Sequence, residues 1–258
     1  MDYKSFAILF LLFLSSCENS SDQITSSNLP TSGNQFPEAL LNVFAKHGGL
    51  GIWESMNTLS YEIEKETGNE KQIIDIKDRR ERIEGANFIT GFDGKDIWLE
   101  ADTSYKGNAI FYHNLMFYFY AMPFVLADDG INYSESVPLE YEGKSYPGIR
   151  ISYDAGVGVS PEDEYFIHYD PETYQMVWLG YTVTYYSKEK SKKIKWIHYD
   201  DWEVYNGLLL PNSMNWFQSV DGKLTEPKKR RKFVKIEISK KKMDEKFFNK
   251  TAQAVVVE

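Results

Sequence analysis

His198 and Asp200 are the residues whose types and spacing best suit chemistry. They alternate with Trp196 and Trp202 along one predicted strand. Side chains two positions apart in a strand share a face, so an imidazole and a carboxylate are expected among aromatic rings. Such a pair suits a metal site, a general acid–base pair or a ligand-orienting dyad. We favour a simpler interpretation, in which this face turns toward solvent or the two side chains satisfy each other. The sequence therefore predicts no catalytic residue, no metal site and no cofactor.

Cys17 is the single cysteine of the chain and follows the apolar run 6–14. That run is too short to cross a hydrocarbon core of about 30 Å as a helix, but it suits a signal peptide. The tetrapeptide Leu14-Ser15-Ser16-Cys17 resembles the bacterial lipobox, in which the cysteine is acylated after cleavage. The resemblance implies a lipoprotein signal peptide over residues 1–16 and a membrane anchor at Cys17. Glu18 in place of Asp implies the outer membrane, with the periplasmic or surface leaflet left open.

The rest of the chain divides into a tether and one domain. Residues 17–35 carry the lipidated cysteine and a Ser-, Asn- and Thr-rich segment that is typical of a flexible linker. Residues 36–258 are long enough for a single large domain with a sizeable core. The net charge of −9 argues against nucleic acid as a partner.

Alternation of apolar and polar residues predicts a mainly β domain. A helical pattern covers the start, from Phe36 to Gly48-Gly49, and period-two patterns follow along most of the chain. Asp93-Gly94 is a two-residue hairpin signal, and Asn206-Gly207 marks a further turn. The apolar run 108–127 interrupts the strands, and we expect one helix or two short helices there because His113, Asn114 and Pro123 argue against a membrane span.

The element order, with modest local motifs, resembles the Lol-type lipoprotein-carrier fold. The motifs are Gly91–Trp98, His168–Thr173 and Asn206–Pro211. The segments 119–126 and 47–49, with Trp53, are also similar to an uncharacterised family of Bacteroidota envelope lipoproteins. The resemblance implies a large curved antiparallel sheet, or half-barrel, with the N-terminal helix and the mid-chain helical insertion on its concave face.

Aromatic side chains make up 16% of the sequence, an excess that suits either pocket walls or an aromatic-rich core. From their alternation we predict that a set of them lines a ligand pocket between sheet and helices. The predicted pocket residues are Trp98, Tyr118, Phe119, Trp178, Tyr181, Tyr185, Trp196, His198, Trp202 and Trp216.

Basic residues concentrate in three runs near the C-terminus: 188–195, 228–232 and 240–242. They are interpreted either as solvated strand positions or as a surface that attracts anionic lipid head groups or an acidic partner. The preferred functional hypothesis is a non-enzymatic, lipid-anchored envelope protein that buries an acyl chain or lipid between sheet and lid helices. The alternative is an accessory or interaction module of an envelope complex with a protein partner and no small ligand.

Overall fold

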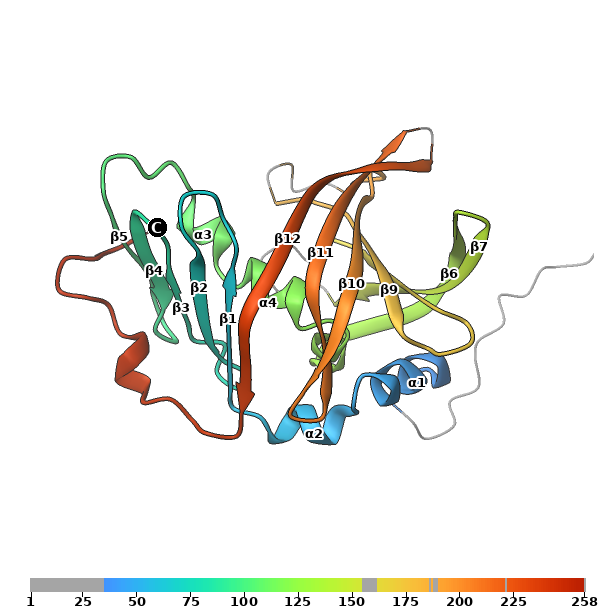
Figure 1. Cartoon of the computed structure of the whole chain (residues 1–258), viewed down its shortest axis with the longest axis horizontal. Helices are drawn as coiled ribbons and strands as arrows, with labels where there is room; N and C mark the ends of the chain where they lie inside the picture. The colour runs from blue at the N-terminus through green and yellow to red at the C-terminus, as the bar shows by residue number, and fades with distance from the viewer. Residues whose placement is uncertain (1–34, 155–161, 186, 188–189, 221, 258) are drawn as a thin grey trace, which may run out of the picture. The chain divides into compact units, whose positions relative to one another are not determined.

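Thirteen strands form one antiparallel sheet in the order β13-β5-β4-β3-β2-β1-β12-β11-β10-β9-β8-β7-β6 (Figure 1). The end strands β13 and β6 do not pair with each other, so the curved sheet stays open. The strands are β1 (Thr58–Ile63), β2 (Glu70–Asp75), β3 (Glu81–Glu84), β4 (Phe88–Phe92), β5 (Ile97–Ala101), β6 (Ile131–Tyr141), β7 (Lys144–Tyr153), β8 (Tyr165–Tyr169), β9 (Met176–Tyr181), β10 (Lys195–Tyr205), β11 (Leu208–Val220), β12 (Lys223–Ser239) and β13 (Val255–Val256). The predicted fold class is confirmed.

This computed structural model describes residues 35–154, 162–185, 187, 190–220 and 222–257. The described strands and helices all belong to one unit, Phe36–Glu258. Cys17 and the predicted signal peptide lie outside the described residues, as does the predicted tether up to residue 34.

Short helices cover one face of the sheet. They are α1 (Glu38–Lys46), α2 (Leu50–Ser55), α3 (Ala109–Tyr112), α4 (Leu115–Tyr120) and the 3₁₀ turn η1 (Phe124–Ala127), while a second 3₁₀ turn, η2 (Glu245–Phe248), precedes β13. The predicted insertion over 108–127 is therefore confirmed as two short helices and a 3₁₀ turn. No helix among the described residues is long and apolar enough to cross a membrane.

The helix-covered face, here called the inner face, carries the main apolar cluster. Leu40, Val43 and Phe44 of α1 and Phe117 and Phe119 of α4 belong to it, together with inward side chains from most strands. In β7 and β8, Ile149, Ile151 and Ile167 are buried in this cluster.

The opposite, outer face holds a smaller cluster of its own. Trp178 and Trp196 pack there with Tyr146, and Phe217 lies against them. Their strand neighbours Leu179 and Ile197 point to the inner cluster, which places the two clusters on opposite sides of the sheet.

β12 joins the two halves of the sheet. Its first part, up to Lys232, pairs with β11, whereas Phe233 to Ser239 pair with β1. From Phe233 onward, β12 is no longer paired with β11. The turn Asn206-Gly207 closes the β10–β11 hairpin. Both turn residues have positive φ, 49° and 87°, which a type I′ hairpin turn requires.

Candidate functional site

A layer of aromatic side chains lies between α4 and the inner face of the sheet. The ring centre of Phe119 is 4.9 Å from that of Tyr181 and 6.2 Å from that of Trp216. Tyr120, the next residue, places its ring 4.6 Å from Phe233 of β12. Ring contacts with both halves of the sheet therefore hold α4 in place.

Few hydrogen bonds cross this aromatic layer. The Tyr199 hydroxyl donates to the backbone oxygen of Phe119 at 2.6 Å, and Trp216 Nε1 donates to the Tyr181 hydroxyl at 3.1 Å. The hydroxyl of Tyr120 is fully buried and has no hydrogen-bond partner within the described protein. A buried hydroxyl without a partner costs about 1–3 kcal/mol, so the Tyr120 hydroxyl is an unused polar group of the layer.

Beside α3 the apolar layer gives way to a buried polar network centred on Glu70, which is 1% exposed. Glu70 accepts from the Tyr112 hydroxyl at 2.5 Å and from Gln72 Nε2 at 2.8 Å, and it forms an ion pair with Lys65. The Tyr61 hydroxyl donates to the Gln72 side chain at 2.7 Å. Burial raises the pKa of Tyr61 and Tyr112 well above the usual value, so both hydroxyls stay protonated and can donate.

Glu81 anchors the start of α4 to β3. The backbone N–H of Asn114 donates to Glu81 Oε2 at 3.0 Å, and His113 Nδ1 lies 3.3 Å from the same oxygen. In the sequence, His113 and Asn114 argue against a membrane span but indicate no further role. Glu70 and Glu81 were not predicted as site residues, because a carboxylate in an alternating strand does not reveal that helices cover it.

His47 fastens the end of α1 to the sheet and was likewise missed. Its ring is 0% exposed; Nδ1 donates to the backbone oxygen of Leu209 at 3.2 Å, and Nε2 accepts from the backbone N–H of Met176 at 3.0 Å. These two bonds fix the neutral tautomer with the proton on Nδ1. Burial lowers the pKa of His47 to about 4.

The ten predicted pocket residues do not form one lining. Phe119 and Tyr181 belong to the inner cluster, and Trp202 and Trp216 pack against it. Tyr118 of α4 is 39% exposed, whereas Tyr185 lies at α3 with its ring centre 5.1 Å from Phe111. Six of the predicted residues thus lie on or beside the helix-covered side.

The other four lie on the outer face. Trp178 and Trp196 form the outer cluster, and the ring centre of His198 is 4.5 Å from that of Trp178. Trp98 is paired with Gly91 on the outer face, fully buried, with Nε1 donating to the backbone oxygen of Phe248 at 2.9 Å. Inner-face ligands cannot reach these four side chains through the sheet.

The predicted sharing of one face by His198, Asp200 and Trp202 is wrong for Trp202. Asp201 has a φ of 57°, outside the extended range, and beyond it Trp202 packs near Tyr199, with ring centres 5.8 Å apart. Tyr199 belongs to the inner cluster. The alternation is therefore broken at Asp201.

His198 and Asp200 form no close pair. His198 Nδ1 lies 4.0 Å from Asp200 Oδ2, and Asp200 is already bound by Ser213 and by Asn215 Nδ2 at 2.9 Å. Burial lowers the pKa of His198, although Asp200 opposes the shift. In the part of the chain that the structure describes, no three His, Cys, Asp or Glu side chains are grouped so that they could hold a metal ion.

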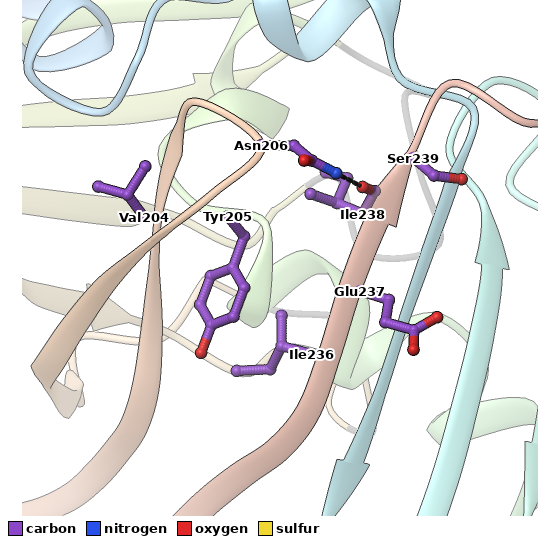
Figure 2. Close-up of a pocket in the computed structure, with 7 residues that line it drawn as sticks. All are labelled: Val204, Tyr205, Asn206, Ile236, Glu237, Ile238 and Ser239. Carbon is purple, nitrogen blue, oxygen red and sulfur yellow. Dashed lines mark hydrogen bonds between the residues drawn. The ribbon is translucent and has the colours of Figure 1, made fainter.

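Two open hollows lie away from the aromatic layer. One, of about 410 Å³, occupies the fork where the β10–β11 hairpin separates from β12; Figure 2 shows its lining residues Val204, Tyr205, Asn206, Ile236, Glu237, Ile238 and Ser239. Asn206 Nδ2 bridges the fork by donating to the backbone oxygen of Ile238 at 2.5 Å. The other, of about 210 Å³, lies between α2 and η1 beside Arg79 and Asp128. Between α4 and the sheet the side chains are in contact.

The chain is similar to a family of unknown function (DUF6503), whose model matches residues 100–225, just under half of its length. No curated protein matches the chain. Among solved structures, a DUF1329 family protein from Desulfovibrio piger is 11% identical, with a TM-score of 0.48 over 82% of this chain and 96% of the other.

Two further structures are similar over most of the chain. A LolA superfamily protein from Nitrosomonas europaea is 8% identical, with a TM-score of 0.44 over 81% of this chain and 96% of the other. An outer membrane lipoprotein-sorting protein domain from Vibrio parahaemolyticus is 10% identical, with a TM-score of 0.35 over 79% and 97% of the two chains.

Proposed function

We propose that this chain is a lipid-anchored protein of the bacterial envelope that binds an acyl chain between the inner face of its sheet and the segment α3–α4–η1. The anchor is Cys17, supported by the lipobox-like sequence before it. The observation that carries the proposal is how the inner face is covered. In the segment α3–α4–η1, helices of four to six residues, rich in aromatic side chains, cover it instead of a second sheet or a long helix.

Helices this short are unstable alone, so their position depends on side-chain packing against the sheet. Phe119 and Tyr120 supply much of that packing in α4, and the hydrogen bond from Tyr199 ties the backbone of the helix. An acyl chain that enters the layer exchanges contacts between apolar side chains for contacts of those side chains with its own CH₂ groups. Each buried CH₂ group contributes about 0.8 kcal/mol, which offsets the cost of moving the helix.

The six tryptophans offer a direct test, because three lie on each face. Trp53, Trp202 and Trp216 contact the inner cluster, whereas Trp98, Trp178 and Trp196 lie on the outer face. Full-length protein carrying Cys17→Ser, which removes any covalent acyl group, is titrated with dibrominated stearic acid. Bromine quenches only indoles that it closely approaches.

We expect saturable quenching of tryptophan fluorescence. A large share of this quenching should be lost in Trp216→Phe, and none should be lost in the matched outer-face variant Trp98→Phe. Absence of saturable quenching would overturn the proposal. So would quenching that is retained in Trp216→Phe and lost in Trp98→Phe, because it would place the ligand on the outer face. Circular dichroism of each variant checks that the sheet is intact.

A further inference from the structure

The basic run of β12 is divided between the two faces of the sheet. Lys229 pairs with Trp216 and Arg231 with Met214 across the β11–β12 ladder. Directly opposed residues share a face, and Met214 and Trp216 belong to or pack against the inner cluster. Lys229 and Arg231 therefore lie on the inner face, two and four positions before Phe233.

These two cations stand at the edge of the aromatic layer. Phe233 is 2% exposed within the inner cluster, Arg231 is half-buried and Lys229 is exposed. The inner face thus changes along one strand from apolar to cationic. An amphiphile whose chain lies beside Trp216 would place its polar end among Lys229 and Arg231.

A third cation approaches from the β1–β2 turn. The Nζ of Lys65 lies 6.0 Å from the ring centre of Tyr112, and its charge is matched by Glu70. No carboxylate of the described residues forms an ion pair with Lys229 or Arg231. Burial lowers the pKa of Lys229, the neighbouring charges of Arg231 and Lys65 lower it further, and the charge of Glu70 opposes the shift. Glu70 is already paired with Lys65, so the three cations at this edge exceed its single negative charge.

We propose that Lys229 and Arg231 bind the anionic head group, carboxylate or phosphate, of an amphiphile whose acyl chain enters the inner layer. This inference rests on the proposed function and specifies its ligand class. A guanidinium matches the geometry of either anion through two parallel hydrogen bonds, and an ammonium adds a point charge. A bound anion also relieves the repulsion between the two cations.

Two ligands that differ only in the anion test the proposal: lysophosphatidic acid and the monoacylglycerol of the same acyl chain. Inorganic phosphate is the third ligand, and it distinguishes a head-group site from a site for free phosphate. Binding to full-length Cys17→Ser protein is compared with binding to the double variant Lys229→Gln/Arg231→Gln. The matched control is Arg230→Gln/Lys232→Gln, which removes the same charge from the same strand at positions that alternate with the inner pair.

We expect the Cys17→Ser protein to prefer lysophosphatidic acid by roughly tenfold or more, as hydrogen bonds to charged groups allow. The inner double variant should bind both lipids equally, while the control keeps the preference. Equal binding of both lipids by the Cys17→Ser protein would overturn this inference and leave the proposed function standing. If neither lipid binds, the proposed function fails as well. Tight binding of phosphate alone, without the lipids, would also overturn the inference.

Discussion

Acid should destabilise this protein through His47, and the size of the effect follows from the contacts of its ring. The imidazole is fully buried and joins α1 to β9 and β11 through two hydrogen bonds to backbone groups. The contact with Met176 requires an unprotonated Nε2. Protonation of His47 in the folded protein would place a charge in the core and turn that acceptor into a second donor.

The pKa of His47 is about 4 in the folded protein, against 6.5 for an unperturbed histidine. Between these two pH values the unfolded chain takes up a proton and the folded chain does not. The stabilisation is therefore complete above pH 6.5 and is lost as the pH falls toward 4. Proton linkage gives a loss of about 2.5 kcal/mol at pH 4.5 relative to pH 7.5.

His47→Gln isolates this contribution, because the amide keeps one donor and one acceptor but does not titrate. Urea unfolding followed by tryptophan fluorescence gives the free energy of unfolding of both proteins at pH 7.5 and pH 4.5. We expect the advantage of wild type over His47→Gln to shrink by about 2.5 kcal/mol between these pH values. Carboxylates that titrate between pH 4.5 and pH 7.5 change the stability of both proteins equally, so their effect cancels in the difference between wild type and His47→Gln.

His198→Gln is the control. Burial lowers the pKa of His198 as well, but Asp200 opposes the shift and the ring is partly exposed, so a smaller change with pH is expected. If the difference between wild type and His47→Gln stays constant from pH 7.5 to pH 4.5, the folded protein tolerates the protonated ring, and the contacts of His47 do not depend on its protonation.

Four further substitutions test the packing, each by urea unfolding. Gly48→Ala should cost more than 2 kcal/mol, because a Cβ there would lie 2.2 Å from the Gly207 oxygen at a φ of 106°, whereas Gly51→Ala meets open space and should be neutral or stabilising. Tyr199→Phe removes the hydroxyl that holds the α4 backbone and should cost about 1 kcal/mol while speeding acyl-chain uptake. Phe233→Ala, in the inner cluster at 2% exposure, should cost about 3–5 kcal/mol.

Local patterns predicted the elements of this fold well where one short-range rule dominates. The insertion over 108–127 was predicted to be helical because its apolar run contains polar residues and Pro123, and α3, α4 and η1 confirm this. The hairpin at Asn206-Gly207 follows from residues that tolerate positive φ. Long-range pairing, such as that of β1 with β12, has no comparable local signal.

The candidate site was predicted less well, for two physical reasons. Alternation assigns side chains to the two faces only while the backbone stays extended. The positive φ of Asp201 interrupts the extended backbone, so alternation no longer gives the face of Trp202. The second reason is that the sheet is apolar on both faces around Trp178 and Trp196. Aromatic content alone cannot separate an inner layer from an outer cluster, so the predicted pocket mixed the two.

β12 shows how stability and the proposed binding can be assigned to different stretches of one strand. From Phe233 onward it pairs with β1 and contributes buried side chains, so substitutions there should weaken the junction between the sheet halves. Before Phe233 it pairs with β11 and carries Lys229 and Arg231 on the inner face without ion pairs to described carboxylates. Neutralising those two cations removes mutual repulsion and breaks no such pair. Changes in ligand preference without loss of folding are therefore expected in the first stretch, and loss of folding in the second.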